Sequence, residues 1–332
     1  MLEHGGNLAL AAVQYGIPLE NWLDLSTGIN PNGYPTPEIA PSAWQRLPID
    51  NDGLIEAAGA YYGCKFALPT AGSQAALQVL PQLRAPSKVA MPSLMYQEHA
   101  KAWQRAGHEV IKFESYPDEN TIKNADVILL CNPNNPTATQ FLATDLLSWH
   151  TQLAKRGGWL IVDEAFIDAT PEQSIAQHAH VEGLFVLRSL GKFFGLAGAR
   201  VGFLLGTEDA LLRAQEAIGP WAISGPSRLV AKQALVDKTW QQNTRLQLPV
   251  SSQRLANLLT QYGLAPVAGS ALFQFTPTEL AAVWQQHLAK HGIWVRLFSK
   301  VSGLKEQSAL RFGLPPDDGW QRLEDALKSS AN

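Results

Sequence analysis

Lys192 lies in the stretch RSLGKFFGLAGARVG (188–202), with Phe193 and Phe194 directly after it and Arg200 eight positions later. An amine that attacks a carbonyl carbon must be neutral part of the time, and apolar surroundings and a nearby cation both favour the neutral form. Arg200 carries a permanent charge and can bind a phosphate through two parallel hydrogen bonds. This stretch therefore predicts a lysine for Schiff-base chemistry beside a phosphate-binding arginine.

Polar residues also stand where three apolar runs end. NPNNPT follows the run at 126–131, Asp163 follows GWLIV, and Ser189 ends the run that leads to Lys192. In an open parallel sheet, ligands bind at the carboxyl ends of the strands. We therefore expect these residues to meet at one edge of a sheet.

The residue types at that edge describe a pocket for pyridoxal 5′-phosphate. An aspartate facing a pyridine nitrogen keeps the nitrogen protonated and makes the ring an electron sink, and an asparagine can hydrogen-bond the ring hydroxylate. The glycine turn in TAGSQAAL (70–77) opens a helix, and its free N–H groups suit a phosphate. With Asp163 as the carboxylate and Lys192 as the Schiff-base partner, the sequence predicts this cofactor.

Strands and helices alternate through the middle of the chain. Continuous apolar runs predict strands at 88–93, 108–113, 126–133, 158–166, 183–190 and 199–206, with helical patterns at 97–107 and 144–157 among them. Continuous rather than alternating apolar runs are typical of strands that are covered on both faces. We expect an α/β fold with a mostly parallel sheet.

The pattern changes near residue 226. Longer helical stretches are followed by the short strands SALFQF, IWVRLF and SALRFGL and by a closing helix, WQRLEDALKS. This predicts a smaller α+β domain. The expected organisation is an N-terminal arm at 1–29, a large cofactor-binding domain at 30–225 and a small C-terminal domain at 226–332. The proline-rich stretch 28–44 is expected to be irregular.

Composition excludes several classes of partner. The chain has 332 residues and a formal net charge of −3, which gives no electrostatic case for nucleic acid or an anionic membrane. No segment approaches the roughly 18 apolar residues of a membrane span. The two cysteines, Cys64 and Cys131, form no C-x-x-C pair, and the first residues lack the charge pattern of a signal peptide. We expect a cytoplasmic protein.

A metal site is not expected. His287 and His291 stand four positions apart, which is metal-like spacing, but no third ligand or H-E-x-x-H pattern supports them. His99 is expected to be structural, on a helix beside Tyr96.

The motifs together resemble a known enzyme family. The chain resembles the aspartate-aminotransferase-like, fold-type-I pyridoxal-phosphate enzymes (aminotransferase class I/II), and within them the threonine-phosphate decarboxylases of cobalamin synthesis. The neighbouring branch is the histidinol-phosphate aminotransferases. The resemblance covers nearly the whole chain and is carried by HGGN (4–7), LDLSTGINPNGYP (23–35), NPNNPT (132–137), VDEAFID (162–168), RSLGKFFGLAGARVG (188–202) and LRFG (310–313).

The resemblance implies roles in cofactor binding. Lys192 would form the Schiff base, Asp163 would partner the pyridine nitrogen, and Asn135 would bond the ring 3-hydroxyl. Tyr96 would stack on the ring. The cofactor phosphate would be held by Gly72, Ser73, Gln74, Ser189 and Arg200.

The resemblance also implies a substrate set. Arg311 matches the arginine that binds the substrate α-carboxylate, and Arg296 is similar to one that reads the substrate's own phosphate. The remaining residues would lie on the arm that closes over the substrate or near its carboxylate; they are His4, Gly6, Asn7 and Asn30.

Two departures from the wider family are informative. Phe166 stands where many aminotransferases have a tyrosine on the cofactor 3-hydroxyl, and the decarboxylase branch resembles this chain in having phenylalanine. Leu47 stands where relatives often have a tyrosine that reaches across the dimer. The resemblance implies a homodimer, and Leu47 leaves open whether that region still contributes across it.

The implied reaction is decarboxylation of L-threonine O-3-phosphate to (R)-1-amino-2-propanol O-2-phosphate. Transamination of histidinol phosphate or a similar amine stays open, because the outcome depends on which Cα bond stands perpendicular to the cofactor ring. A nucleotide-binding phosphate loop at LGK is disfavoured, since Val186 and Phe193 occupy the places where that motif needs a glycine and a serine or threonine.

Overall fold

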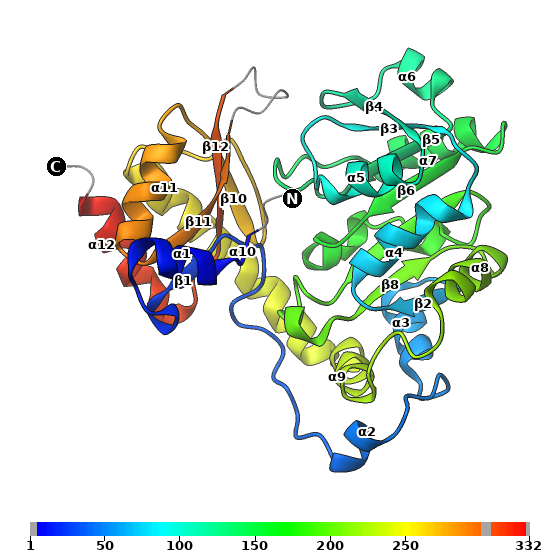
Figure 1. Cartoon of the computed structure of the whole chain (residues 1–332), viewed down its shortest axis with the longest axis horizontal. Helices are drawn as coiled ribbons and strands as arrows, with labels where there is room; N and C mark the ends of the chain where they lie inside the picture. Colours follow the sequence, from blue (N-terminus) through cyan, green and yellow to red (C-terminus); the bar gives the residue numbers. More distant parts are fainter. Residues whose placement is uncertain (1–4, 300–306, 330–332) are drawn as a thin grey trace. The chain divides into compact units, whose positions relative to one another are not determined.

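The computed structural model describes residues 5–299 and 307–329, which group into two compact units (Figure 1). The large unit comprises 33–135 and 139–243. The small unit comprises 5–32, 136–138 and the described residues from 244 onward. The boundary at 243 falls inside one helix, α10 (Lys238–Gln261).

The large unit is built on a seven-stranded sheet in the order β2-β8-β7-β6-β5-β3-β4. Its strands are β2 (Ala67–Thr70), β3 (Lys88–Pro92), β4 (Glu109–Phe113), β5 (Val127–Cys131), β6 (Trp159–Asp163), β7 (Leu184–Ser189) and β8 (Gly202–Leu205). Strands β4, β3, β5, β6 and β7 are parallel, and β8 runs antiparallel to both of its neighbours. The predicted mostly parallel sheet is confirmed.

The three central strands are buried along their whole length, as their continuous apolar runs predict. Apolar residues of α4, α5 and α8 join those of β5, β6 and β7 in one core cluster. The helices of this unit are α2 (Pro41–Gln45), α3 (Leu54–Tyr62), α4 (Ser73–Val79), α5 (Glu98–Arg105), α6 (Glu119–Asn124), α7 (Ala143–Ala154), α8 (Glu208–Ile218) and α9 (Gly225–Val236). The predicted irregular stretch 28–44 is irregular over 28–40, but its end belongs to α2, where Pro41 is accommodated in the first helical turn.

The small unit has a five-stranded sheet in the order β1-β11-β12-β10-β9. Its strands are β1 (Leu23–Leu25), β9 (Ala268–Ser270), β10 (Phe273–Pro277), β11 (Ile293–Phe298) and β12 (Ala309–Gly313), and its helices are α1 (Leu8–Tyr15), α11 (Ala281–Lys290), α12 (Trp320–Ser329) and the C-terminal part of α10. Strand β1 pairs with β11 in parallel, and the other described pairs in this sheet are antiparallel. The N-terminal segment thus completes the sheet of the C-terminal part.

Helix α10 is longer than the sequence predicts. It begins at Lys238 and runs through Pro249, whereas the helical pattern SSQRLANLLTQYG covers only 251–263. A proline interrupts a helical pattern because it lacks an N–H, which is why the first half was not predicted. Short 3₁₀ helices complete the chain: η1 (Leu19–Asn21), η2 (Leu80–Leu83), η3 (Ile167–Ala169), η4 (Pro171–Gln173), η5 (Ala176–His178), η6 (Ala197–Ala199) and η8 (Asp317–Gly319). Among the described residues, no helix combines the length and apolarity that crossing a membrane needs.

Candidate active site

Asp163 ends β6 and is held at both carboxylate oxygens. The side chain is 6% exposed. Its Oδ2 lies 2.8 Å from Nε2 of His99, and its Oδ1 accepts a hydrogen bond of 3.0 Å from the backbone N–H of Ala165. A buried carboxylate needs such partners, since an unpaired buried charge is costly. The carboxylate therefore has a fixed orientation at the carboxyl end of the central strand.

His99 connects Asp163 to Tyr96. The two rings of His99 and Tyr96 lie 6.0 Å apart, edge to face, and the Tyr96 hydroxyl donates to Oε1 of Gln74 over 3.2 Å. Burial raises the pKa of Tyr96 to about 12, with the carboxylates of Glu98 and Asp163 adding to the effect. The phenol thus keeps its proton at neutral pH.

Sequence reasoning placed His99 beside Tyr96 and missed its contact with Asp163. The sequence holds no signal for that contact, because the spacing of three positions between Tyr96, just before α5, and His99 relates only these two rings. That spacing puts the two side chains on neighbouring positions of one helical turn.

Cys131 links the end of β5 to the same cluster. It lies opposite Asp163 in the strand register, and its thiol hydrogen-bonds the backbone at Tyr96 and Asn135. Burial raises the pKa of this thiol, so it stays protonated at neutral pH. Ligand atoms of His99, Cys131 and Asp163 lie within 4.8 Å of one another, which is metal-like spacing, but His99 and Asp163 hydrogen-bond each other directly.

The turn after β5 is fixed by Asn132. Its side-chain amide exchanges two hydrogen bonds with the backbone of Phe141, at 3.1 and 3.0 Å, and Asn134 donates to the carbonyl of Leu94 over 2.8 Å. These bonds hold Asn135, which is half-buried, beside the cluster of Asp163.

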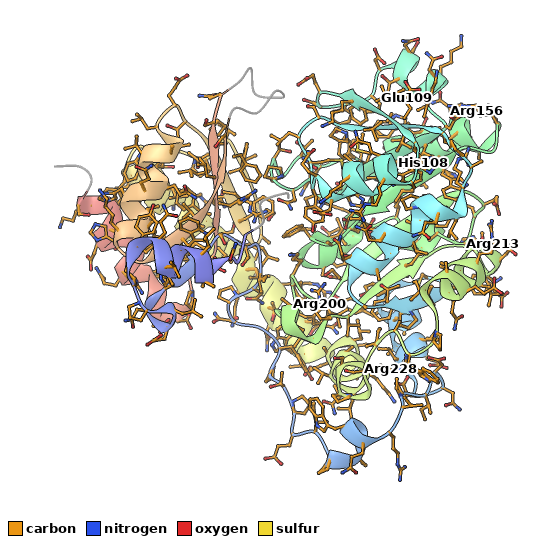
Figure 2. The ribbon with its side chains drawn as sticks, viewed as in Figure 1. His108, Glu109, Arg156, Arg200, Arg213 and Arg228 are labelled. Atoms are coloured by element: carbon orange, nitrogen blue, oxygen red, sulfur yellow. The ribbon has the colours of Figure 1, made fainter. Side chains whose placement is uncertain are left out.

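The backbone of the glycine turn that precedes α4 lies beside the guanidinium of Arg200. Gly72 has a φ of +71°, and a Cβ there would lie 2.8 Å from Nη2 of Arg200. A Cβ on Gly202 would collide with the backbone N of Ser73, so the turn lies directly on β8. Ser189 faces Gly202 in the register. Figure 2 labels Arg200, on the loop just before β8. The structure thus brings together four of the residues predicted to hold the cofactor phosphate, namely Gly72, Ser73, Ser189 and Arg200.

Lys192 lies on the loop after β7. It is half-buried, and its Nζ lies 5.4 Å from the ring centroid of Phe166, three positions after Asp163 in the sequence. Phe193 and Phe194, which follow it, have no exposed surface. The apolar surroundings that the sequence predicts for Lys192 are present.

A buried ion network supports the strand ends that carry the site. Nη1 of Arg188 donates to Glu164 over 2.8 Å and to Ser174 over 3.1 Å, and Nη2 bonds Asp168. Burial lowers the pKa of Arg188, but the carboxylates of Asp168 and Glu164 outweigh burial and raise it. Arg188 and Glu164 are the immediate chain neighbours of Ser189 and Asp163, so this network fixes the backbone at both positions.

Replacing Arg188 with methionine is expected to destabilise the protein by about 3–5 kcal/mol, because two carboxylates would then be buried without their cation. Urea unfolding would measure the loss. Arg213→Met is the matched control, since Arg213 forms an exposed pair with Asp209 at 3.2 Å and its loss is expected to cost less than about 1 kcal/mol. Equal losses in the two variants would contradict the role assigned to the network.

The small unit carries two arginines on adjacent strands. Arg296 of β11 faces Arg311 of β12 in the antiparallel register. Burial, and then the charge of Arg296, lower the pKa of Arg311 to about 10, while Asp24 opposes the shift. Arg311 stays cationic at neutral pH, and two neighbouring guanidinium groups suit an anionic ligand.

One predicted arm residue, Gly6, is linked to Arg311 through Ser26. The backbone N–H of Gly6 donates to Oγ of Ser26 over 2.7 Å, and Nη2 of Arg311 donates to the carbonyl of Ser26 over 2.6 Å. Asn7 precedes α1 directly. Asn30 is buried, and its Oδ1 accepts from the backbone N–H of Asn32. His4 lies outside the described residues. Ser26 was not among the predicted site residues.

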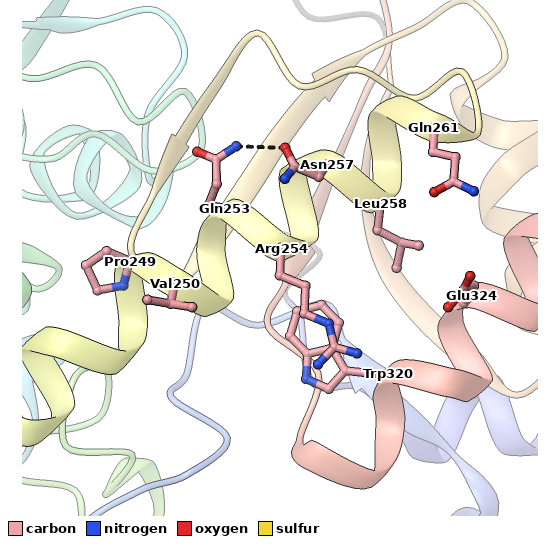
Figure 3. A pocket seen from close by; sticks show the side chains of 9 residues that line it. All are labelled: Pro249, Val250, Gln253, Arg254, Asn257, Leu258, Gln261, Trp320 and Glu324. Atoms are coloured by element: carbon pink, nitrogen blue, oxygen red, sulfur yellow. Dashed lines mark hydrogen bonds between the residues drawn. The ribbon is translucent and has the colours of Figure 1, made fainter.

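Two of the grooves that described residues line belong to the small unit. One, of about 710 Å³, lies between α10 and α12, where the guanidinium of Arg254 stacks 4.2 Å from the ring centroid of Trp320 (Figure 3). No predicted site residue lines it. The other, of about 410 Å³, includes Asn30 together with Leu314 and Pro315. Only the second groove therefore involves the predicted site.

Comparison with known families decides the relationship. The family profile of class I and II aminotransferases matches residues 45–327. The chain belongs to this family. A threonine-phosphate decarboxylase of Pseudomonas aeruginosa is 49% identical over 98% of this chain and 97% of its own length, and one of a Sinorhizobium species is 38% identical with the same coverage.

Solved structures show the same fold. The chain of a histidinol-phosphate aminotransferase from Sinorhizobium meliloti, solved in complex with pyridoxal 5′-phosphate, superposes with a TM-score of 0.78 at 20% identity, covering 99% of this chain and 96% of that one. The predicted aspartate-aminotransferase-like, fold-type-I architecture is confirmed.

Proposed function

We propose that this protein uses pyridoxal 5′-phosphate to decarboxylate L-threonine O-3-phosphate, giving (R)-1-amino-2-propanol O-2-phosphate for cobalamin synthesis. One observation carries the proposal: the 49% identity to a threonine-phosphate decarboxylase extends over nearly the full length of both chains. The similarity to the histidinol-phosphate aminotransferase, at 20% identity, supports the fold alone.

The residues of the large unit fit this cofactor. Support comes from the Gly72 turn, where the Cβ of any other residue would fill the space beside the Arg200 guanidinium that a phosphate group needs. Support also comes from Asp163, a buried carboxylate that His99 and Ala165 hold in one orientation. When bound, the cofactor supplies an electron sink for the pair left on Cα.

The chain's own residues bind and orient the cofactor in this proposal. Lys192 would bind the cofactor aldehyde through Nζ and would return a proton to Cα after CO2 has left. Asp163 would keep the pyridine nitrogen protonated, Asn135 would bond the 3-hydroxyl, and Tyr96 would lie against the ring. The phosphate is held by Gly72, Ser73, Gln74, Ser189 and Arg200.

The small unit selects the bond that breaks. Arg311 and Asn30 would bind the substrate carboxylate. Arg296 would bind the substrate phosphate together with the arm residues His4, Gly6 and Asn7. By holding the carboxylate in one direction, these residues would select the Cα–carboxylate bond for cleavage, so that CO2 would leave and the electron pair would stay on Cα. Phe166 supports this outcome, because the decarboxylase branch resembles this chain at that position.

The test is a direct comparison of two reactions. The purified, cofactor-loaded protein is incubated with L-threonine O-3-phosphate, and CO2 release is measured beside the loss of amine that depends on 2-oxoglutarate. The expected result is CO2 release in step with substrate loss and no requirement for 2-oxoglutarate. A parallel incubation with histidinol phosphate is expected to give no amine transfer. Amine transfer without CO2 would overturn the proposal in favour of the aminotransferase.

We also propose a cytoplasmic homodimer. The exposed apolar side chains of Trp44, Leu47 and Ile49, each 65% exposed or more, support a partner surface on the large unit. Cys64 and Cys131 are free and buried, which supports a reducing compartment. Sedimentation of the purified protein would measure the mass, and a monomer at all concentrations would contradict the dimer.

A further inference from the structure

Ser26 makes hydrogen bonds with three parts of the small unit. Its Oγ donates to Oδ1 of Asp24 over 2.6 Å, and its backbone N–H donates to the same oxygen over 2.8 Å. Its Oγ also accepts the backbone N–H of Gly6 over 2.7 Å, and its carbonyl accepts from Nη2 of Arg311 over 2.6 Å. Ser26 has no exposed surface. One buried serine therefore contacts the N-terminal arm and the predicted carboxylate-binding arginine at once.

The glycines of the arm are needed for this approach. A Cβ on Gly5 would collide with the carbonyl oxygen of Ser26, which is the atom that Arg311 binds. Gly6 has a φ of +81°, where a side chain is strained. The arm thus lies directly against the Ser26 carbonyl, so that a shift of either one changes their contact.

The guanidinium of Arg311 is positioned from two directions. The Ser26 carbonyl binds Nη2, and the Phe273 ring lies 5.4 Å from the Arg311 Cζ. Because a guanidinium is planar, fixing one Nη atom and one side of the plane limits the directions in which its remaining N–H groups can bind an anion. A shift of the Ser26 carbonyl would therefore re-aim Arg311.

We propose that Ser26, held in place by Asp24, is a positioning residue that couples the N-terminal arm to Arg311 and so fixes the direction in which the substrate carboxylate is held. This proposal rests on the proposed function and deepens it, since the carboxylate direction decides between loss of CO2 and transfer of the amine. Ser26 touches neither substrate nor cofactor in this scheme. It acts through the arm and through Arg311.

The test uses Ser26→Ala in the cofactor-loaded, full-length protein. Loss of the hydroxyl removes the acceptor of Gly6 N–H, so amide hydrogen exchange in residues 5–8 is expected to rise about tenfold or more. The KM for L-threonine O-3-phosphate is expected to rise about five- to tenfold, as for one lost hydrogen bond, with a larger share of substrate diverted to amine transfer. The absorption spectrum and the affinity for the cofactor are expected to stay unchanged, because the residues that hold it belong to the other unit.

Ser252→Ala is the matched control. Ser252 is also a buried serine of the small unit, donating to Ser270 and accepting from Gln274, and none of the three is a predicted site residue. It is expected to leave arm exchange, KM and product ratio as in the wild type. If Ser26→Ala matched Ser252→Ala in these readouts, the proposal would be wrong.

A second variant approaches the same contact from the arm. Gly5→Ala introduces the colliding Cβ and leaves Ser26 intact, so it is expected to reproduce the exchange and KM changes of Ser26→Ala; a wild-type KM would contradict the coupling. The proposed function and the coupling through Ser26 can each be contradicted without the other. A wild-type protein that releases no CO2 overturns the proposed function, whereas the exchange of residues 5–8 in Ser26→Ala decides the coupling without any reaction.

Discussion

Replacing Lys192 with alanine is expected to lower decarboxylation of L-threonine O-3-phosphate by at least about a thousandfold, the range in which loss of a proton-transferring group falls. The side chain that would bind the cofactor aldehyde is then gone, and so is the amine that would return a proton to Cα. The absorption band of the lysine-bound cofactor, in the visible or near-ultraviolet, is expected to disappear in the same variant. Stopped assays of CO2 release and a spectrum of the purified protein measure the two effects.

The surroundings of Lys192 make the interpretation specific. Its Nζ lies 5.4 Å from the centroid of the Phe166 ring, and the buried Phe193 and Phe194 follow it, so alanine removes an amine that packs beside aromatic side chains. Lys155→Ala is the control, because Lys155 is exposed after the end of α7. It is expected to keep both the band and the rate. If the Lys192→Ala protein retained the band, the cofactor would be linked to another residue, and the role proposed for Lys192 would be wrong.

The sheet of the large unit could be predicted because its signal is local. Buried parallel strands need apolar residues on both faces, so each of β5, β6 and β7 stands out as a continuous run. Strands β1 and β2 were not predicted. β1 has only three residues, and β2 contains Pro69, so neither shows a strand period. Their places are set by partners distant in sequence, Ile293 for Leu23 and Gly202 for Thr70.

The positions of the candidate site residues follow from the same logic. Asp163 and Ser189 end parallel strands, and the ends of such strands share one edge, so their proximity could be expected from sequence. The family resemblance then implied roles that residue type and spacing alone do not indicate, such as those of Tyr96 and Arg311. What neither supplied were contacts set by tertiary packing: His99 on Asp163, and Ser26 between Gly6 and Arg311. No local sequence pattern around a serine or a histidine indicates which distant residue it will hydrogen-bond.

Glu164 illustrates the same limit. From the sequence, it could have been an ordinary residue that ends a strand. In the structure it is fully buried, it accepts from Arg188 and from Ser174, and burial raises its pKa although Arg188 opposes the shift. Such a group is tolerated only because the whole network forms together. The network depends on residues between positions 164 and 188, and their convergence is a property of the fold.

Asp163→Asn is expected to lower the decarboxylation rate by about 10²–10⁴-fold while the lysine-bound cofactor band remains. The amide has nearly the same shape, and its oxygen can still accept from the backbone N–H of Ala165. What is lost is the negative charge that would keep the pyridine nitrogen protonated and so maintain the ring as an electron sink. This variant and Lys192→Ala thus share a loss of turnover and differ in their spectra, which separates the role of the carboxylate from that of the amine.

Asp126→Asn is the matched control, since this half-buried aspartate also accepts a backbone N–H, from Lys88 over 2.8 Å, just before β5. It is expected to leave turnover within about twofold, as for a change outside the site. His99→Phe removes only the partner of Oδ2, so the carboxylate keeps its charge and loses its fixed direction; a decrease of about tenfold is expected, as for one lost supporting hydrogen bond. The order of the three effects is the decisive result. If Asp163→Asn cost no more than Asp126→Asn, the buried carboxylate at the end of β6 would have no part in the chemistry.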